Sequence, residues 1–381
     1  MLRLRPPRFA SFNRRKLFTA AMGALALAVA GAPGPARAAD ERVVNIYNWS
    51  DYIDPATLKK FTEETGIRVV YDTYDNNEII ESKLLAGKSG YDVVVPTGPT
   101  VQRLIRAGVL KELDKAALPN LKHAWPEIAA RLATYDPGNR HAVNYMWGTT
   151  GLGVNVAKAR QALGPDVKLD SLDLLMKPEL ASKLKSCGIM ILDAAEDVLP
   201  AALRHIGRDP DSKAPADLQA AAEALGKVRG DIRKLHSSEY IAALANGDIC
   251  MAFGYSGDIL QARRRAKEAK NGVEVVYVLP REGAQMWFDN FAIPVDAPHP
   301  AEAYAFINFM MRPDVAAANS NFTAYASGNG DARALVAPAL LNDPNVYPDA
   351  ATMTRLFTTT TPDDRSQRAI TRLWTRLRSG R

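Results

Sequence analysis

Short apolar runs alternate with amphipathic segments along the N-terminal half of the chain. Residues 42–48 (RVVNIYN) form one such run and predict a buried strand. Asp54 and Pro55 follow as the cap and first residue of a helix, which Gly66 ends. The same alternation predicts further elements: strands at 67–74 and 91–95, and helices at 76–87 and 97–108.

The alternation returns in the second half, where strands at 188–192 and 248–255 each precede a helix. Apolar runs follow at 273–280 and 286–294, and a further helix is predicted at about 300–312. Strands that alternate with helices of this length indicate a parallel sheet with right-handed crossovers.

The chain is long enough for two hydrophobic cores, because domains usually contain about 100–200 residues. Residues 145–151 and 279–283 are candidate crossings between two α/β lobes. Two lobes joined by more than one short connection leave a cleft between them, which is a favoured place for a small ligand.

The first 38 residues have the features of a secretory signal peptide. A basic start precedes an apolar run from Leu17 to Ala30, and Ala36-Arg37-Ala38 follows as a cleavage motif. The apolar run is too short and too rich in alanine for a membrane span. We therefore predict cleavage near Ala38-Ala39 and export to the periplasm.

Removal of this segment changes the charge of the protein. The whole chain carries a formal net charge of +6, but residues 1–38 hold seven basic side chains and no acidic one, which leaves −1 for the remainder. The basic balance therefore gives no reason to expect nucleic acid or an anionic membrane as a partner. We expect a soluble monomer.

Two cysteines, Cys187 and Cys250, remain in the mature chain. In an oxidising compartment an even pair suggests one disulfide, and two unrelated buried thiols are the alternative.

Catalytic and cofactor patterns are weak. The GKS at 87–89 resembles the end of a P-loop, but position 82 is Ser and no strand leads into it. The GYSG at 254–257 is not a nucleophile elbow, because Asp258 stands where the second Gly belongs. The five histidines lack metal-ligand spacing. We predict no metal, no cofactor and no covalent catalysis.

Acidic and aromatic residues recur together after the predicted strands, where open parallel sheets collect their ligands. The residues at these positions are Trp49, Ser50, Asp51 and Tyr52; Thr97; Asp193, Glu196 and Asp197; Tyr255 and Asp258; Trp287 and Asp289. Each has a structural alternative, since Asp often caps a helix and Trp or Tyr often belongs to a core. Recurrence at four sites favours a ligand site over four coincidences.

The chemistry of these residues suits an organic cation. Carboxylates in first helical turns are expected to stay ionised, because the helix N-terminus favours the charged form. Such carboxylates accept charge-assisted hydrogen bonds from ammonium groups, and aromatic faces attract cations and cover methylene groups.

Residues 43–78, VVNIYNWSDYIDPATLKKFTEETGIRVVYDTYDNNE, resemble the start of the periplasmic polyamine receptors. These are the substrate-binding proteins of putrescine/spermidine ABC importers, within extracellular solute-binding protein family 1. The likeness continues through YDVVVPTG, YMWGTTGLGVN, LKSCGIMILDAAEDV, SSEYIAALANGDICMAFGYSGD and FDNFAIPVDA. It covers nearly the whole mature chain in order, and the putrescine branch is the most similar.

The resemblance implies a periplasmic-binding-protein fold of type II, with a hinge and a ligand cleft between two α/β lobes. One lobe is expected to comprise residues 39–146 plus about 278–322, and the other 147–277 plus about 323–381. The family pattern also supports a Cys187–Cys250 disulfide. The implied function is that of a non-enzymatic receptor, which captures putrescine or spermidine and delivers it to an ABC permease in the inner membrane.

The family's ligand box falls on Tyr325 and on the residues already noted other than Asp193 and Glu196: Trp49, Ser50, Asp51, Tyr52, Thr97, Asp197, Tyr255, Asp258, Trp287 and Asp289. Among these residues, we expect Asp289 and Asp258 at one ammonium end of the ligand, and Asp51 with Asp197 at the other end or near it. The side chains expected to line the alkyl chain are Trp49, Tyr52, Tyr255, Trp287 and Tyr325.

Four positions depart from the putrescine-type pattern. Thr97 replaces Ser, Asp197 replaces Glu, and Tyr255 stands where Trp is common. Trp287 replaces the usual Phe and matches spermidine receptors instead. Putrescine, spermidine, cadaverine and agmatine therefore remain open as ligands.

Two alternatives come from other classes of protein. An extracellular glycosidase also pairs carboxylates with Trp platforms. A receptor for iron or an amino acid is nearer in fold, but iron favours Tyr and His ligands. An amino acid needs an Arg for its carboxylate, and the strand ends offer none.

Overall fold

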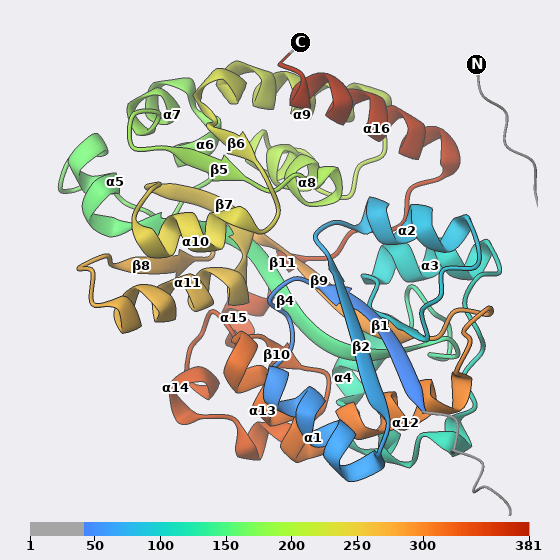
Figure 1. Ribbon diagram of the computed structural model, residues 1–381. Helices are drawn as coiled ribbons and strands as arrows, with labels where there is room; N and C mark the ends of the chain where they lie inside the picture. Colours follow the sequence, from blue (N-terminus) through green and yellow to red (C-terminus); the bar gives the residue numbers. More distant parts are fainter. Residues whose placement is uncertain (1–41, 381) are drawn as a thin grey trace, which may run out of the picture. The chain divides into compact units, whose positions relative to one another are not determined.

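Two long antiparallel strands, β4 (Ala142–Asn155) and β9 (Ala284–Ala292), run through the middle of the protein (Figure 1). The computed structural model describes residues 42–380. The predicted signal peptide, residues 1–38, and its cleavage position lie outside the described residues.

Eight strands follow one another in the order β2-β1-β3-β9-β4-β7-β5-β6, while β8 and β10 pair with β4 and β11 pairs with β9. The bounds of the other strands are β1 Val43–Trp49, β2 Arg68–Tyr74, β3 Val93–Val94, β5 Ile189–Ile191, β6 Lys234–Leu235, β7 Met251–Tyr255, β8 Val275–Val278, β10 Ala326–Ser327 and β11 Leu356–Phe357.

The sheet is mixed, so the prediction of a parallel sheet is only partly right. β1 pairs in parallel with β2 and β3, and β5 pairs in parallel with β6 and β7, as the alternation of helices and strands predicted. β4 and β9, however, pair antiparallel with each other, and β4 also pairs antiparallel with β7 and β8. An antiparallel neighbour needs no crossover helix, so the helix–strand rhythm carries no signal for it.

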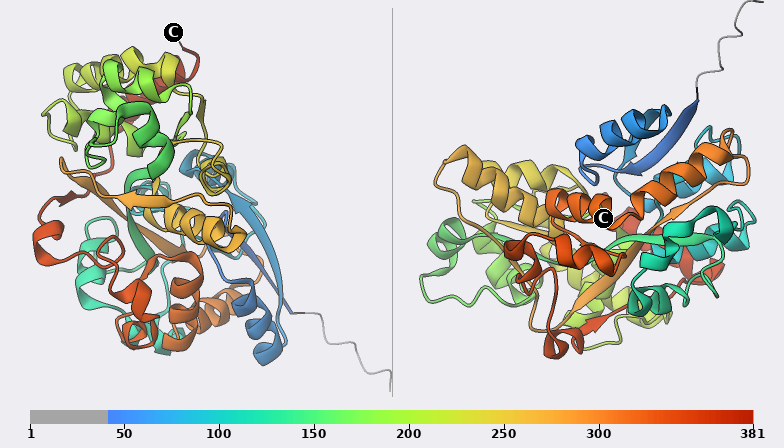
Figure 2. Two further views of the ribbon diagram at one scale, coloured as in Figure 1. Left: turned by 90° about the vertical axis from the view of Figure 1, so that its left-hand side faces the viewer. Right: turned by 90° about the horizontal axis from the view of Figure 1, so that it is seen from below.

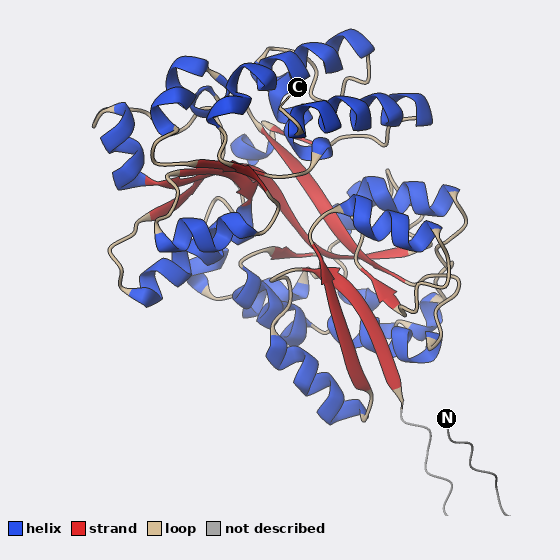
Figure 3. Cartoon of the chain, turned by 45° about the horizontal axis from the view of Figure 1, so that its top comes forward, coloured by secondary structure: helices blue, strands red, loops and turns tan. Residues whose placement is uncertain are grey.

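Helices cover the strands on both faces (Figure 3). Their bounds are α1 Pro55–Thr65, α2 Asn77–Leu85, α3 Gly98–Arg106, α4 Pro126–Leu132, α5 Val156–Leu163, α6 Asp173–Met176, α7 Pro178–Leu184, α8 Ala195–His205, α9 Pro215–Val228, α10 Glu239–Asn246, α11 Ser256–Ala269, α12 Pro300–Met310, α13 Pro313–Thr323, α14 Pro338–Leu341, α15 Ala350–Met353 and α16 Asp364–Arg378.

The first helix has the ends that the sequence predicted. The Asp54 side chain accepts a hydrogen bond from the Ala56 backbone N–H at 2.9 Å. Gly66 ends the helix with φ 68°, a left-handed conformation that glycine adopts without a Cβ penalty.

The buried apolar side chains form two large hydrophobic cores. The first contains Ile46, Phe61 and Phe306, and the second contains Leu152 and Phe253. Figures 1 and 2 show α16 beside α8 and α9 at one end of the molecule, while α12 and α13 lie at the other. Each core therefore gathers segments that are distant in sequence.

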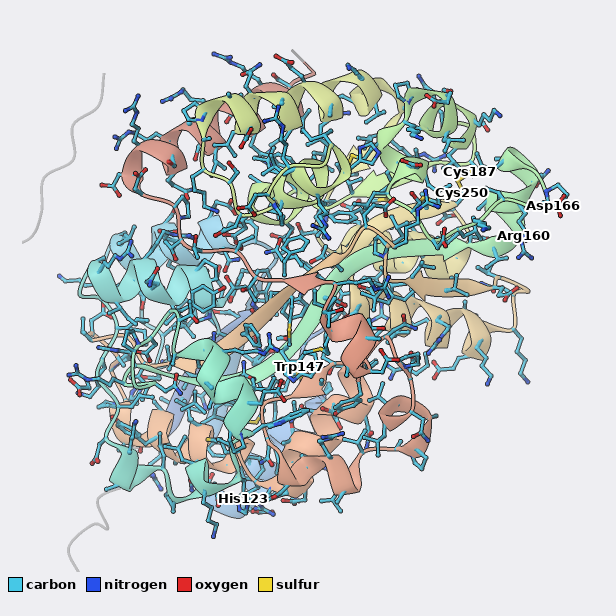
Figure 4. All side chains as sticks on the ribbon, turned by 180° about the vertical axis from the view of Figure 1, so that it is seen from behind. His123, Trp147, Arg160, Asp166, Cys187 and Cys250 are labelled. Atoms are coloured by element: carbon cyan, nitrogen blue, oxygen red, sulfur yellow. A yellow bond between two sulfur atoms is a disulfide. The ribbon has the colours of Figure 1, made fainter. Side chains whose placement is uncertain are left out.

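β4 passes from one core to the other. Met146 packs in the first core, and its neighbour Trp147, labelled in Figure 4, packs in the second. The stretch predicted as a connection, residues 145–151, is thus part of a 14-residue strand.

Cys187 and Cys250 form a disulfide, as predicted (Figure 4). The bond joins residues just before β5 and β7, two neighbouring strands of the second core. The alternative of two separate thiols is therefore excluded.

We expect Cys187→Ala/Cys250→Ala to lower the free energy of unfolding by about 4 kcal/mol, because the bond closes a loop across a sequence separation of 63 residues in the unfolded chain. Denaturant titration of oxidised and reduced protein measures this loss. Reduction should bring the wild type to the stability of the variant and leave the variant unchanged. Equal stability of the variant and the oxidised wild type would contradict the expectation.

Within residues 42–380, no helix combines the length and the hydropathy that a bilayer crossing requires.

Candidate functional site

A cavity with an empty volume of about 640 Å³ lies where β1, β7 and β9 bring aromatic and acidic side chains together. Its walls come from segments of both hydrophobic cores. The lining residues are Trp49, Ser50, Tyr52, Asp75, Asn77, Thr97, Pro99, Glu196, Asp197, Ser237, Ser238, Tyr255, Asp258, Gln285, Trp287, Asp289, Tyr325 and Thr359. Every residue that the sequence singled out for the ligand box is among them except Asp51.

Five aromatic rings form a continuous wall around the cavity. The ring of Trp49 lies 6.4 Å from that of Tyr255, and Tyr255 lies 5.5 Å from Trp287, measured between centroids. Trp287 then contacts Tyr325 at 5.3 Å, and Tyr325 contacts Tyr52 at 5.0 Å. All four pairs meet edge to face, an arrangement that aromatic pairs prefer.

Backbone contacts position two rings of this wall, those of Trp49 and Tyr325. The indole N–H of Trp49 donates to the carbonyl of Val95 at 2.9 Å. A Cβ on Gly257 would lie 2.5 Å from the ring of Tyr325. Only glycine at this first turn of α11 therefore allows the ring to lie against the helix.

Asp258 lies in the first turn of α11 and is buried. Its two oxygens accept hydrogen bonds from the hydroxyls of Tyr240 and Tyr325, each at 2.7 Å. Burial raises the pKa of Asp258 to about 7, although the two hydroxyls favour the charged form.

Asp197 lies in the first turn of α8 and is also buried. Its carboxylate accepts hydrogen bonds from Thr150 at 3.2 Å and from the hydroxyl of Tyr255 at 3.1 Å. Burial, together with the neighbouring charge of Glu196, raises the pKa of Asp197 to about 8.

Asp289 lies on β9, where an isolated antiparallel bridge places it opposite Thr97. Burial raises the pKa of Asp289 well above its ordinary value, and Asp197 and Asp258 add to the shift, while the Tyr52 hydroxyl opposes it. Asp289 Oδ1 is buried and has no hydrogen-bond partner among the described residues. Such an atom is costly unless a ligand supplies a donor.

The expectation that these carboxylates stay ionised is not supported by the structure. The first helical turn was expected to favour the charge of Asp197 and Asp258, but both groups are withdrawn from water. Burial raises the pKa of each, because desolvation outweighs the effect of the helix N-terminus. A bound cation would therefore favour the charged form of these carboxylates near neutral pH.

Asp51 does not reach the cavity, in contrast to the prediction. It has φ 56°, and its carboxylate forms an ion pair with Arg265 at 2.7 Å, with 41% of the side chain exposed. Its neighbours Ser50 and Tyr52 line the cavity, whereas Asp51 does not. The predicted pairing of Asp51 with Asp197 around one ammonium end therefore has no support in the geometry.

The sequence reasoning missed eight of the lining residues. Asp75 and Asn77 directly follow β2, so the strand-end rule applied there would have identified them. Glu196 was noted after its strand but was not chosen. The other five are Pro99, Ser237, Ser238, Gln285 and Thr359. Ser237 and Ser238 follow β6, a two-residue strand too short to predict.

The described ionisable lining residues of the cavity include acidic side chains but no Lys or Arg. Its lining includes five carboxylate side chains, and none of the described residues that line it is Lys or Arg. The arrangement is suited to a small molecule with more than one positive charge and an apolar body.

Comparisons with known proteins agree with this geometry. Residues 56–348 match the family model of the bacterial extracellular solute-binding proteins. The chain is 50% identical over 358 residues to the putrescine-binding periplasmic protein SpuD of Pseudomonas aeruginosa (strain UCBPP-PA14), covering 94% of this chain and 98% of that protein. It is 48% identical over 345 residues to the putrescine-binding periplasmic protein PotF of Escherichia coli (strain K12), covering 90% and 93%.

A solved structure shows the same architecture. The spermidine/putrescine ABC transporter substrate-binding protein PotD from Streptococcus pneumoniae strain Canada MDR_19A matches with a TM-score of 0.71 at 30% identity, covering 89% of this chain and 99% of that chain. The prediction of a two-lobe α/β fold of the periplasmic-binding-protein type is thereby confirmed. The chain belongs to the bacterial extracellular solute-binding proteins.

Proposed function

We propose that this protein captures a linear polyamine, putrescine or spermidine, and delivers it to an ABC permease. The observation that carries this proposal is the cavity with five acidic side chains, no basic one among its described lining residues, and a wall of five aromatic rings. The names of the relatives SpuD and PotF, both putrescine-binding proteins, support the same ligand class.

In this proposal, the ammonium groups of the ligand lie against the buried carboxylates. Asp289 and Asp258 receive one end, and Asp197 lies near the other. An arriving ammonium offsets the cost of ionising these groups and supplies the donor that Asp289 Oδ1 lacks. The methylene chain lies along the ring faces of Tyr255 and Trp287.

We further propose that the two lobes are those the family pattern implies, residues 39–146 plus about 278–322 and 147–277 plus about 323–381. The change of core along β4, between Met146 and Trp147, supports the break at 146/147, although Ile128, Leu132 and Tyr135 pack in the second core and Tyr325 packs in the first. Closure of both lobes on one ligand makes the affinity depend on residues of each. Export through residues 1–38, a monomeric state and docking of the loaded form on an inner-membrane permease complete the proposal.

The same cavity argues against the alternatives. A free amino acid carries a carboxylate, for which the described lining residues provide no cationic side chain. A glycosidase would need two carboxyl groups in acid and base roles, together with a site for a sugar. The named relatives, in contrast, are binding proteins. The protein therefore acts in this proposal as a receptor and not as an enzyme.

Isothermal titration calorimetry with putrescine, spermidine, cadaverine and agmatine tests the proposal directly. The protein is first unfolded, dialysed and refolded so that any co-purified ligand is removed. Lysine serves as a control, because it adds a carboxylate to the carbon framework of cadaverine. We expect heat from at least one polyamine and none from lysine. No binding to any of the four would refute the proposal.

We expect Trp287→Phe to shift the preference from spermidine toward putrescine. The indole of Trp287 contacts both Tyr255 and Tyr325, so a smaller ring at this position reduces the aromatic surface along a longer chain. The ratio of the two dissociation constants measures the effect. Trp125→Phe, which changes a tryptophan outside the cavity lining, is the matched control. An unchanged ratio in Trp287→Phe would refute the proposed role.

A further inference from the structure

Glu196 lies between the ligand cavity and a second cavity. The second cavity has an empty volume of about 1110 Å³ and lies among α2, α3, α8 and α16. Glu196, Pro99 and Thr359 line both cavities. The carboxylate of Glu196 is therefore available to groups on either side.

Arg103 approaches Glu196 from the second cavity. Its Nη2 lies 3.8 Å from Glu196 Oε2. Its Nε donates hydrogen bonds to both carboxylate oxygens of Glu81, and its Nη2 donates to one of them, all at 2.8–3.0 Å. Nη2 also donates to Thr100 at 3.0 Å. Only 15% of the Arg103 side chain is exposed. The guanidinium is thus held in place by Glu81 and Thr100 and directed at Glu196.

The other oxygen of Glu196 faces a neutral donor. Asn77 Nδ2 donates to Glu196 Oε1, and the Asn77 side-chain oxygen accepts from the backbone N–H of Thr97 at 3.5 Å. Asn77 and Thr97 both line the ligand cavity. These contacts link the orientation of Glu196 to the wall of the ligand site.

Glu196 differs from Asp197 and Asp258 because a cationic side chain lies close to its carboxylate. Asp197 and Asp258 accept hydrogen bonds from hydroxyl groups, which carry no charge. Among the ion pairs of the described residues, Arg103 is the one Lys or Arg side chain that pairs with a carboxylate of the ligand cavity. Arg103 therefore compensates one of the negative charges that a ligand would otherwise meet.

We propose that Arg103 is a specificity-determining residue, which neutralises Glu196 and so adjusts the charge of the cavity to a diamine. This inference rests on the proposed function. The Coulomb energy of an added negative charge is proportional to the charge of the ligand. An uncompensated Glu196 would therefore stabilise a bound triamine more than a bound diamine.

The double variant Glu81→Gln/Arg103→Gln tests this inference. It removes one negative and one positive charge together, so the net charge of the protein is unchanged while Glu196 loses its cation. We expect the ratio of putrescine to spermidine dissociation constants to shift toward spermidine by roughly five- to thirtyfold, as expected for one charge at partly screened distances. Adding Glu196→Gln to the double variant should abolish the shift.

Two further variants keep the test decisive. Arg106→Gln removes an exposed arginine from the end of the same helix and should leave the ratio unchanged. Glu196→Gln alone removes a negative charge from the cavity wall while Arg103 keeps its ion pair with Glu81, so it should shift the ratio toward putrescine. This opposite sign would not arise from a general loss of stability, which circular dichroism and thermal unfolding measure separately.

The outcomes separate the two proposals. If the wild type binds no polyamine, the proposed function fails. If the wild type binds polyamines but the folded double variant keeps the wild-type ratio, the role of Arg103 is overturned while the function stands. Equal weakening of both ligands in every variant of this set would also overturn it, because Glu196 would then serve only the structure.

Discussion

Replacement of Asp289 by asparagine is expected to weaken polyamine binding by about 30-fold or more, as expected for truncating one partner of a buried charge pair. Asp289 is 4% exposed, and its Oδ1 has no partner among the described residues, so a bound ammonium is the partner it is poised to accept. Calorimetric titration of the refolded variant with putrescine and spermidine measures the loss.

The same variant should not destabilise the ligand-free protein. Burial raises the pKa of Asp289, so the charged form is unfavourable in the folded state without a cation. An amide at this position removes that cost, and the melting temperature without ligand should stay equal or rise. Asp166→Asn, at an exposed aspartate (Figure 4), is the matched control and should change neither quantity. Wild-type affinity in Asp289→Asn would contradict the assignment of Asp289 to the ligand.

The stability of the ligand-free protein is expected to fall as the pH rises from about 4 to about 8. Burial raises the pKa of Asp258 to about 7 and that of Asp197 to about 8, from an ordinary value of 3.8. Between these limits the folded state binds more protons than the unfolded state, so the free energy of unfolding decreases with pH. Denaturant titrations over this range measure the slope. Asp197→Asn should flatten it, and an identical slope in this variant would contradict the explanation.

Polyamine affinity should change with pH in the opposite direction. A bound dication favours the ionised carboxylates, so binding below pH 7 releases protons, and each proton released corresponds to about a tenfold gain in affinity per pH unit. Titrations in buffers of different ionisation enthalpy count the protons. Their number should decline as the pH rises through 8. Binding without proton release at pH 6 would show that Asp197 and Asp258 are already ionised without ligand.

Local sequence signals determined most of the secondary structure. The cap at Asp54 and the left-handed Gly66 mark the two ends of α1, an 11-residue helix. The alternation of helices and strands likewise identified the parallel pairs around β1 and β5. These features depend on neighbours in sequence, and a single sequence therefore contains enough information to predict them.

The antiparallel strands required the tertiary structure. β4 carries glycine at 148, 151 and 153 and threonine at 149 and 150, so its apolar pattern is weak although it is a 14-residue strand. Gly148 has a packing reason, because a Cβ there would lie 2.8 Å from the ring of Trp287. Residues that are required for contact with a distant segment weaken the apolar sequence pattern of the strand that contains them.

The candidate site likewise combines features that the sequence predicts with features that only the tertiary structure shows. The sequence by itself identified the aromatic and acidic residue types at the strand ends, together with the Cys187–Cys250 pair, because each lies at a recognisable local position. Only the tertiary structure showed that Asp51 lies outside the cavity lining and that its carboxylate pairs with Arg265, more than 200 residues away in sequence. Only the tertiary structure also showed that Asp197 is withdrawn from water and that Arg103 lies against Glu196. Burial and ion pairing depend on what surrounds a group in space, and segments far apart in the chain determine those surroundings.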